Sequence, residues 1–117
     1  RTIPIRYYNG DVDIKLSFLR GLYSANGSVV SNRITFKTSS SNLRDQLQIM
    51  LSSVGIRSYF TTNKSKDVEF KNGTYTCKES YDINISNDRD KFVRLIGFIQ
   101  DYKNQKINLN PGTLGFN

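Results

Sequence analysis

The chain has 117 residues, which suits one domain with a single modest hydrophobic core. Its formal charge of +7 favours a polyanionic partner, nucleic acid first of all, although a merely soluble, well-charged surface explains the charge equally well. One cysteine (Cys77) and no histidine exclude an internal disulfide, a Cys/His zinc site and a histidine-activated nucleophile, so a bound metal would be a hard cation held by oxygen atoms.

The first predicted element is a helix over about residues 13–26, and a strand hairpin over 28–38 follows it. The apolar stripe of the helix consists of Ile14, Phe18, Leu19 and Leu22. The residue period then changes to two, and the hairpin is expected to turn near Ser31 and Asn32. Side chains alternate along its second arm, with Ile34 and Phe36 on one face and Arg33, Thr35 and Lys37 on the other.

A second helix is predicted over 42–54, where apolar residues recur at helical spacing between a serine-rich run that can cap it and Gly55. Two further strands, 56–62 and 76–86, flank a loop in which Asn72 and Gly73 mark a turn. The outward faces of these strands are expected to carry Arg57, Tyr59 and Thr61, and Lys78, Ser80, Asp82 and Asn84. A third helix starts after Asn87, with an apolar stripe of Phe92, Leu95, Ile96 and Ile99.

The predicted order is therefore αββαββα. Because each strand has one apolar face, the sequence predicts an α+β fold in which a four-stranded antiparallel sheet carries helices on one face and exposes the other. The exposed face is basic and rich in hydrogen-bonding groups, which suits a groove of duplex DNA. The alternative is an ordinary solvent-facing strand surface with no ligand.

Residues 19–27, LRGLYSANG, end the first predicted helix and resemble the nine-residue signature of the LAGLIDADG homing endonucleases. The matching positions are Leu19, Gly21, Leu22, Ala25 and Gly27. The flanking segments 3–4, 18–21 and 27–29 look like the second of two motifs in endonucleases carried inside inteins. The predicted element order also fits the family's repeat over about 12–106. The resemblance thus implies that 1–117 is a single LAGLIDADG unit with tails 1–11 and 107–117.

In that family two signature helices pack side by side, one from each unit, and their ends deliver acids that hold divalent metal for phosphodiester cleavage. The resemblance implies an interface helix, double-stranded DNA as the ligand, and a second repeat or an identical chain as partner. The expected interface residues are Leu19, Gly21, Leu22 and Ala25. The alternative for Gly21 is an ordinary close contact inside one domain.

The chain departs from the signature at two positions. Ser24 stands at the sixth, where the family has an acid, and Asn26 stands at the eighth, the place of the metal-binding acid. An amide brings no negative charge to a hard cation, and Asp11 and Asp13 lie about 20 Å away at the other end of the helix. We therefore expect no metal in this chain, Mg²⁺ in active relatives, and impaired catalysis. The acid at position 26 was lost either by natural decay or by a deliberate Asp-to-Asn change. Alternatives are an active or nicking enzyme whose partner repeat supplies the acid, and a structural or protein-binding remnant.

The resemblance also implies that Lys103, just beyond the third predicted helix, lies near the cleavage centre, although a solvated helix-end lysine would suit the dipole equally well. Arg33 and Arg57 are candidates for guanine, and Asn32 and Asn84 for adenine. Lysines in the loop before the last strand, including Lys71, suit phosphate contacts. The residues expected to bind DNA are Ser28, Asn32, Arg33, Thr35, Lys37, Arg57, Tyr59, Thr61, Lys64, Lys66, Lys78 and Asn84.

The wider context is also predicted from the sequence. The chain starts at Arg1 without a methionine, as expected of a piece of a longer protein, and segments 23–28 and 72–77 look like insertions in cobalamin-dependent ribonucleotide reductases. Splicing cannot reside here, because there is no histidine and the last residues are Phe116 and Asn117. With no apolar run long enough for a bilayer and no signal-peptide pattern, we expect a cytoplasmic protein without membrane contact.

Overall fold

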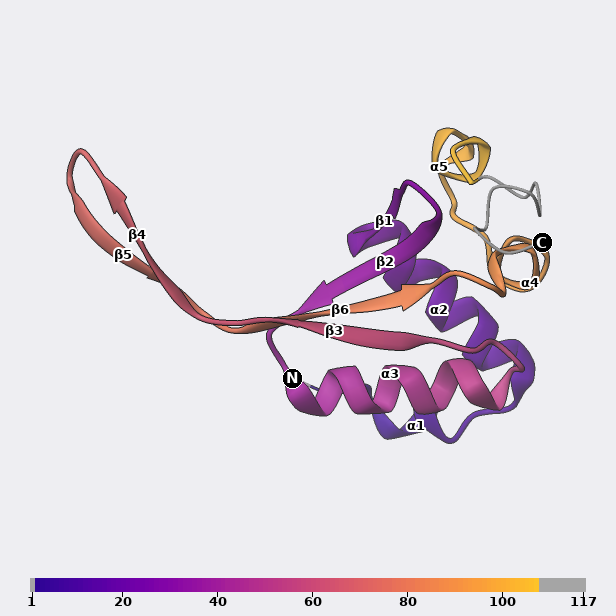
Figure 1. Cartoon of the computed structure of the whole chain (residues 1–117). Helices are drawn as coiled ribbons and strands as arrows, with labels where there is room; N and C mark the ends of the chain where they lie inside the picture. The colour runs from indigo at the N-terminus through magenta and orange to yellow at the C-terminus, as the bar shows by residue number, and fades with distance from the viewer. Residues whose placement is uncertain (1, 108–117) are drawn as a thin grey trace.

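A twisted antiparallel sheet backed by helices forms the body of the molecule, and a long two-stranded arm extends from it (Figure 1). The structure is a computed structural model that describes residues 2–107, with the backbone alone at 68, 70, 75 and 77. The elements are α1 (Ile5–Tyr8), α2 (Val12–Asn26), β1 (Gly27–Val30), β2 (Arg33–Thr38), α3 (Ser41–Ser53), β3 (Tyr59–Asn63), β4 (Lys66–Phe70), β5 (Gly73–Cys77), β6 (Ser80–Ile85), α4 (Arg89–Leu95) and α5 (Asp101–Gln105). The predicted α+β class is confirmed.

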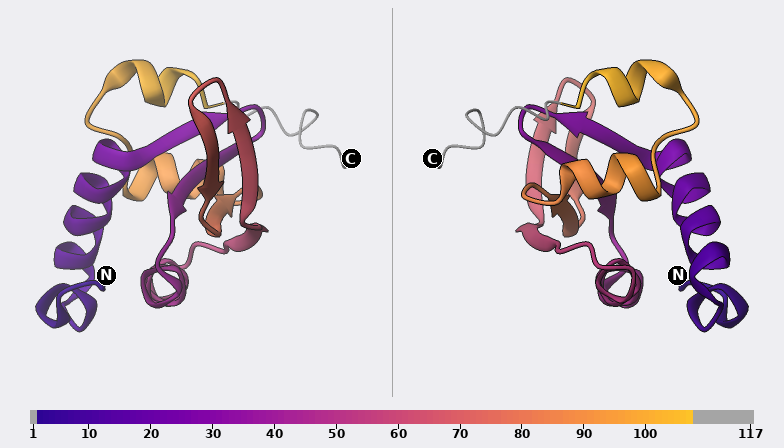
Figure 2. Two further views of the ribbon diagram at one scale, coloured as in Figure 1. Left: turned by 90° about the vertical axis from the view of Figure 1, so that its left-hand side faces the viewer. Right: turned by 90° about the vertical axis from the view of Figure 1, so that its right-hand side faces the viewer.

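The main sheet has the strand order β1-β2-β6-β3, and every neighbouring pair is antiparallel. Its apolar face carries Ile34, Phe36, Ile83 and Ile85, each at most 1% exposed. Helices α2, α3 and α4 lie on that side of the sheet (Figure 2) and close the core over it. Within residues 2–107 no helix lies on the opposite face, as the alternating pattern predicted. Among residues 2–107, no helix is long and apolar enough to cross a membrane.

Helix α3 follows its sequence signals closely. The Ser40 side chain accepts a hydrogen bond from the Leu43 backbone N–H at 3.1 Å, which caps the open N-terminal turn. At the other end Gly55 adopts a φ of +86°, and the Ile56 N–H returns to the Leu51 carbonyl at 2.9 Å. Leu43, Leu47, Met50 and Leu51 are buried against the sheet. The predicted helix over 42–54 is confirmed to within one residue.

The predicted stripe of α2 is only partly the core face. Leu19, Tyr23 and Ser24 are buried, whereas Ile14 is 44% exposed and Phe18 and Leu22 are half-buried on another side of the helix. Apolar residues therefore cover two faces of α2, and helical spacing alone does not tell which one meets the sheet. The second apolar face borders an open groove that residues 2–107 leave unfilled.

The arm corrects the expected loop between the last two strands. Strands β4 and β5 pair with each other, and their register continues the register of β3 and β6 across the short breaks at 64–65 and 78–79. No residue is inserted on either side, so the alternation of side chains runs through the whole hairpin. The predicted strands change accordingly: β3 begins only at Tyr59, and 76–86 divides into the end of β5 and β6.

The predicted third helix is broken in two. Gly97 has a φ of +66°, which ends α4 and reverses the chain before α5 begins. Phe98 enters the core at 1% exposed, with its ring centroid 5.3 Å from that of Phe92, while Leu95 and Ile99 are 41% and 62% exposed. The expected apolar stripe is therefore wrong at those two positions. Lys103 lies within α5, not just beyond a single long helix.

Candidate functional site

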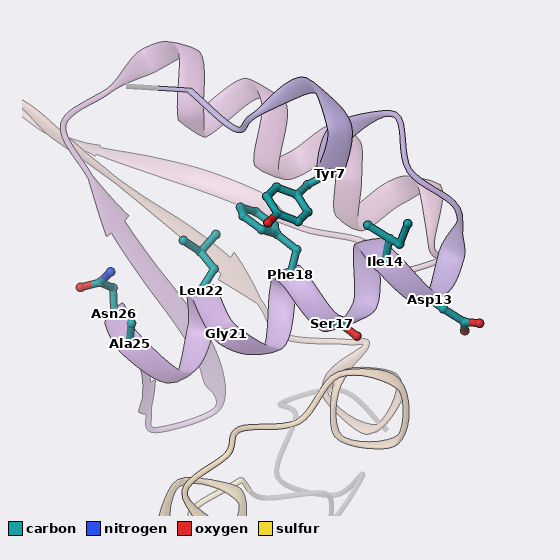
Figure 3. Close-up of a pocket in the computed structure, with 9 residues that line it drawn as sticks. All are labelled: Tyr7, Asp13, Ile14, Ser17, Phe18, Gly21, Leu22, Ala25 and Asn26. Carbon is teal, nitrogen blue, oxygen red and sulfur yellow. The ribbon is translucent and has the colours of Figure 1, made fainter.

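An open groove of about 720 Å³ runs along the uncovered face of α2. Helix α1 forms its other wall, because Tyr7 stacks on Phe18 with ring centroids 4.8 Å apart and an interplanar angle of 20°. The floor is mostly apolar and ends in polar groups (Figure 3). The lining residues are Tyr7, Asp13, Ile14, Ser17, Phe18, Gly21, Leu22, Ala25 and Asn26. The spacing of the α2 residues is that of one helical face, so the groove is shaped to receive an elongated apolar element.

Gly21 lies in the middle of this groove and is not in close contact with any other part of the described chain. A Cβ atom built at Gly21 would meet nothing within 4 Å, whereas one at Gly27 would lie 2.7 Å from the Tyr23 carbonyl oxygen. Gly27 is therefore required by its own fold, and Gly21 is not. The alternative expected for Gly21, a close contact inside one domain, is wrong for residues 2–107.

The two positions where the signature is broken have different surroundings. Asn26 is exposed at the last residue of α2, and its side chain lies at the end of the groove (Figure 3). Ser24 is 6% exposed, and its hydroxyl accepts a hydrogen bond from the Ile99 N–H at 2.8 Å. Ser24 thus anchors the segment after Gly97, while Asn26 faces the space outside the chain.

Lys103 is bound to the same end of α2. Its ammonium donates to the Ser24 and Gly27 carbonyl oxygens, both at 3.1 Å, and lies 5.4 Å from the centroid of the Phe98 ring. Asn104 holds the turn that carries it, because its side chain accepts from the Phe98 N–H at 2.8 Å and donates to the Phe98 carbonyl at 2.9 Å. Lys103 is therefore a half-buried group beside Asn26, not a solvated lysine at the end of its own helix.

The donor atoms near Asn26 do not fit a divalent cation. Within the described part of the chain, no three Asp, Glu, Cys or His side chains come together. The Asn26 amide is neutral, and the nearby Ser24 and Gly27 carbonyls already accept from Lys103. Hard divalent cations prefer carboxylates and several oxygen ligands.

The open face of the main sheet is ordered in rows across the strands. Strand pairing places Ser28, Thr35, Asn84 and Tyr59 in one row and Lys37, Asp82 and Thr61 in the next. Arg33 lies on the same face, two residues before Thr35, and Asn32 is exposed at the hairpin tip beside Ser31, whose φ is +52°. Six of the residues expected to bind DNA thus fall in two adjacent rows.

Asn84 is the exception on this face. It is 2% exposed, and its amide nitrogen donates to the Asp82 carbonyl at 3.3 Å, while its amide oxygen has no partner among the described residues. The structure corrects the expectation that this side chain points freely outward. By contrast, Ser28, Lys37, Tyr59 and Thr61 are exposed.

Arg57 is also placed differently from the prediction. It precedes β3, and its guanidinium holds Asp88 with two hydrogen bonds of 3.1 Å, while its backbone N–H donates to the same carboxylate at 2.8 Å. The side-chain hydrogen bonds from Arg57 lower the pKa of Asp88, and those bonds in turn raise the pKa of Arg57. Arg57 therefore fixes the start of β3, and Arg33 has no ion pair within residues 2–107.

The lysines of the arm divide between its two faces. The continuous register puts Lys64 and Lys66 on the side opposite Tyr59 and Thr61, whereas Lys78 shares the side of those two residues. Asp67 also lies on the Tyr59 side and accepts a hydrogen bond from the Thr76 hydroxyl at 2.8 Å. Lys71 is exposed at the tip of the arm.

Three contributors to the site were missed at the sequence level. Tyr7 lies in a segment treated as a tail, and nothing in its neighbourhood indicated a groove wall. Asp88 immediately precedes α4, and nothing around it in the sequence indicated a partner 31 residues away. Asn104 had no recognisable signal, because its role depends on the turn at Gly97.

The sequence profile of LAGLIDADG-like domains matches residues 13–97, which contain α2 except its first residue, the main sheet, the arm, α3 and α4. The chain belongs to the LAGLIDADG-like domain family. No curated protein sequence is significantly similar to it.

Solved structures of the homing endonuclease I-DmoI have a similar fold. Mesophilic variants of I-DmoI align over 80% of this chain and 46% of theirs, with a TM-score of 0.59 and 24% identity. An I-DmoI variant with its target DNA and magnesium aligns over 79% and 46%, with a TM-score of 0.57 and 25% identity. I-DmoI with DNA and calcium aligns over 93% and 49%, with a TM-score of 0.58 and 23% identity. This chain thus spans about half the length of the I-DmoI chains that it matches.

Proposed function

We propose that this chain is one DNA-binding half of a LAGLIDADG homing endonuclease and that a second unit packs into the groove along α2. The observation that carries the proposal is the apolar groove around Gly21, which residues 2–107 leave open. A glycine in the middle of a helix destabilises it, so its presence there favours a close approach by an external backbone. The half-length match to I-DmoI supports a second repeat in the same polypeptide, and an identical chain is the other possible occupant.

The DNA-binding surface in this proposal is the open face of the main sheet. Its two rows supply hydroxyl and ammonium groups from β1, β2 and β3, with Arg33 at the start of β2, while β6 contributes the Asp82 carboxylate. A two-stranded ribbon fits the major groove, where hydrogen-bonding side chains distinguish the bases. Structures of I-DmoI hold its target DNA, which supports the same ligand class here. Of the two arginines expected to contact guanine, Arg33 remains the candidate, because Arg57 is engaged with Asp88.

The proposal includes impaired catalysis by this half. An acid is missing at Asn26, so cleavage by a pair of units would depend on the acid of the other unit and would produce at most one nicked strand. The signature and its flanking segments also support an intein origin, with a cobalamin-dependent ribonucleotide reductase as the host. Mapping nicks after incubation of the two-unit protein with Mg²⁺ and the uninterrupted host gene would distinguish a nicking enzyme from an inactive one.

The test of DNA binding uses fluorescence anisotropy with a random-sequence duplex of about 30 base pairs over a range of salt concentrations. Lys37→Gln removes a charge from the open face, and we expect weaker binding and a salt slope reduced by about one. Lys15→Gln is the matched control, because Lys15 lies on α2 and donates to Ser53 at 3.2 Å on the helical side. Equal losses in both variants would mean that net charge alone drives binding. No affinity at low salt would refute the proposal in favour of a protein-binding module.

A further inference from the structure

The arm leaves the body of the molecule at a defined row of the main sheet. Strand β2 ends at Thr38, which pairs with Tyr81, and Tyr81 pairs with Thr62 on its other side. Beyond this row the hairpin has two strands only, and no helix of residues 2–107 lies alongside it (Figure 1). A two-stranded ribbon twists more strongly than a wide sheet and is marginally stable on its own. The direction of the arm is therefore determined by contacts at this row.

Arg44 of α3 contacts this row from the helix-covered side of the sheet. Phe60 pairs with Ile83, which is 0% exposed in the core, so Phe60 and Tyr81 lie on the same face as Ile83. The rings of Phe60 and Tyr81 are nearly perpendicular, with an interplanar angle of 86° and centroids 6.0 Å apart. The guanidinium carbon of Arg44 lies over both rings, 4.4 Å from the Phe60 centroid and 4.5 Å from the Tyr81 centroid. One cation thus bridges β3 and β6, the two strands that continue into the arm.

Contacts of α3 fix the position of this guanidinium. Its Nε donates to the Asp45 carboxylate at 2.8 Å, and the Arg44 side chain is only 18% exposed. One turn later, the Gln48 amide donates to the Ser58 carbonyl at 3.4 Å, just before β3 begins. Helix α3 therefore contacts the β3 segment at two points, and the contact made by Arg44 is the one nearer to the arm.

We propose that Arg44 is a positioning residue: its contacts with the two rings set the direction of the arm, and with it the stretch of duplex that the chain covers. The second part of this inference rests on the proposed function. Phe60 lies between Tyr59 and Thr61 in the strand, so Arg44 is on the face opposite the proposed DNA-binding surface and acts without contacting the duplex. Two cation–π contacts of ordinary strength favour one arm direction over others about tenfold.

The first test measures the arm in the free chain, without DNA. Spin labels on Lys71→Cys at the arm tip and Ser52→Cys on the exposed side of α3 give a distance distribution by double electron–electron resonance, with Cys77→Ser as the background. We expect one narrow peak for this background. Arg44→Gln should raise the ratio of other arm directions to this one about tenfold, because a neutral amide loses the attraction to both rings. An unchanged distribution would overturn the inference.

Two further variants separate the ring contacts from the loss of a charge. Arg94→Gln removes the same charge from α4, where the Arg94 side chain is 65% exposed and pairs with Asp90 at 3.5 Å, and it should leave the distribution unchanged. Phe60→Leu keeps Arg44 and removes one ring. Because Phe60 is 40% exposed, the fold should tolerate this change, and the distribution should broaden as it does for Arg44→Gln. Broadening by Arg94→Gln, or none by Phe60→Leu, would contradict the inference. Circular dichroism confirms that each variant is folded.

The second test asks whether the direction of the arm matters for DNA binding. Arg44→Lys and Arg94→Lys both keep the net charge, so the bulk electrostatic attraction to a random-sequence duplex of about 30 base pairs is the same for both. We expect Arg44→Lys to bind about threefold more weakly, because a compact ammonium does not replace a planar guanidinium over two rings. Arg94→Lys should bind like the wild-type chain. In a chain whose residues 65–78 are replaced by a tight turn, Arg44→Lys should have no effect, and an equal loss there would overturn the role of the arm.

Failure of this inference is distinguishable from failure of the proposed function. If neither the wild-type chain nor any variant binds duplex, the function as a DNA-binding half is refuted, whereas the label distances still decide whether Arg44 directs the arm. If the chain binds duplex and Arg44→Lys binds as tightly as Arg94→Lys, the function stands and the role of Arg44 in DNA binding is refuted.

Discussion

The substitution Gly21→Ala should make this chain more stable alone and less able to pair. Gly21 is exposed in the middle of α2, and an added methyl group meets nothing within 4 Å, so it creates no clash inside the chain. Replacing a mid-helix glycine by alanine stabilises a helix by about 0.5–1 kcal/mol, mainly because the unfolded chain loses freedom. For a domain of this size, that gain raises the melting temperature by about 2–4 °C.

The same methyl group should disturb a helix packed against Gly21. Overpacking at a close interface costs about 1–3 kcal/mol, which corresponds to a pairing affinity roughly 5 to 150 times weaker. Thermal unfolding at low protein concentration measures the first effect. The weaker pairing is measured by sedimentation of the isolated chain, or by expressing the chain fused to a second unit with and without the substitution. The two effects have opposite signs only if the groove is an interface.

Gly55→Ala provides the control for this prediction. A Cβ at Gly55 also meets nothing within 4 Å, but its φ of +86° strains any other residue, so this variant should be destabilised by about 1 kcal/mol with or without a partner. If Gly21→Ala lowers the melting temperature of the isolated chain, the glycine serves its own fold and the reasoning from the groove is refuted.

Ser24→Ala should destabilise the chain by about 1–2 kcal/mol in urea unfolding and speed hydrogen exchange at Ile99, whose N–H loses a buried acceptor; unchanged exchange would contradict this contact. Asp88→Asn should lose about 1–2 kcal/mol at pH 7, because Arg57 is left with a neutral partner. Folding lowers the pKa of Asp88, so its carboxylate stabilises the folded chain above the unfolded pKa of about 3.9. This stabilisation is lost as the pH falls through the folded pKa. The stabilities of the wild-type chain and the Asp88→Asn variant should therefore converge in acid. Replacing 65–78 by a tight turn should leave thermal stability within about 1 kcal/mol and shorten the DNase footprint, because the remaining pairs keep their register; a large loss of stability would show that the arm supports the body.

The elements with strong local signals were predictable from the sequence. Helix α3 has a capping serine, a regular apolar stripe and a terminal glycine, and all three are realised in the structure. The first hairpin was predicted because polar and apolar side chains alternate on both sides of its turn. The match of 19–27 to the signature located α2, and three of its predicted interface residues, Gly21, Leu22 and Ala25, line the groove. The prediction is wrong for Leu19, which is 0% exposed in the core of its own fold.

What could not be predicted depends on contacts between distant residues. The apolar spacing of α2 is satisfied by two faces, and only the position of the sheet determines that Tyr23 is buried and Ile14 is exposed. The break at Gly97 was hidden because its flanking apolar residues keep a helical period. Likewise, Arg57 carried no local sign that Asp88 would hold its guanidinium.

The continuous register of the hairpin formed by β3–β4 and β5–β6 also determines how the arm can change in length. A strand advances about 3.3 Å per residue, close to the rise of about 3.4 Å between successive base pairs, so the arm gains roughly one base-pair step of reach for each residue added to both strands. Adding a single residue to each strand at 64–65 and 78–79 would exchange the side on which Asp67 and Lys66 lie. Relatives of this chain can therefore lengthen their reach while keeping the same chemistry toward the duplex only in steps of two residues per strand.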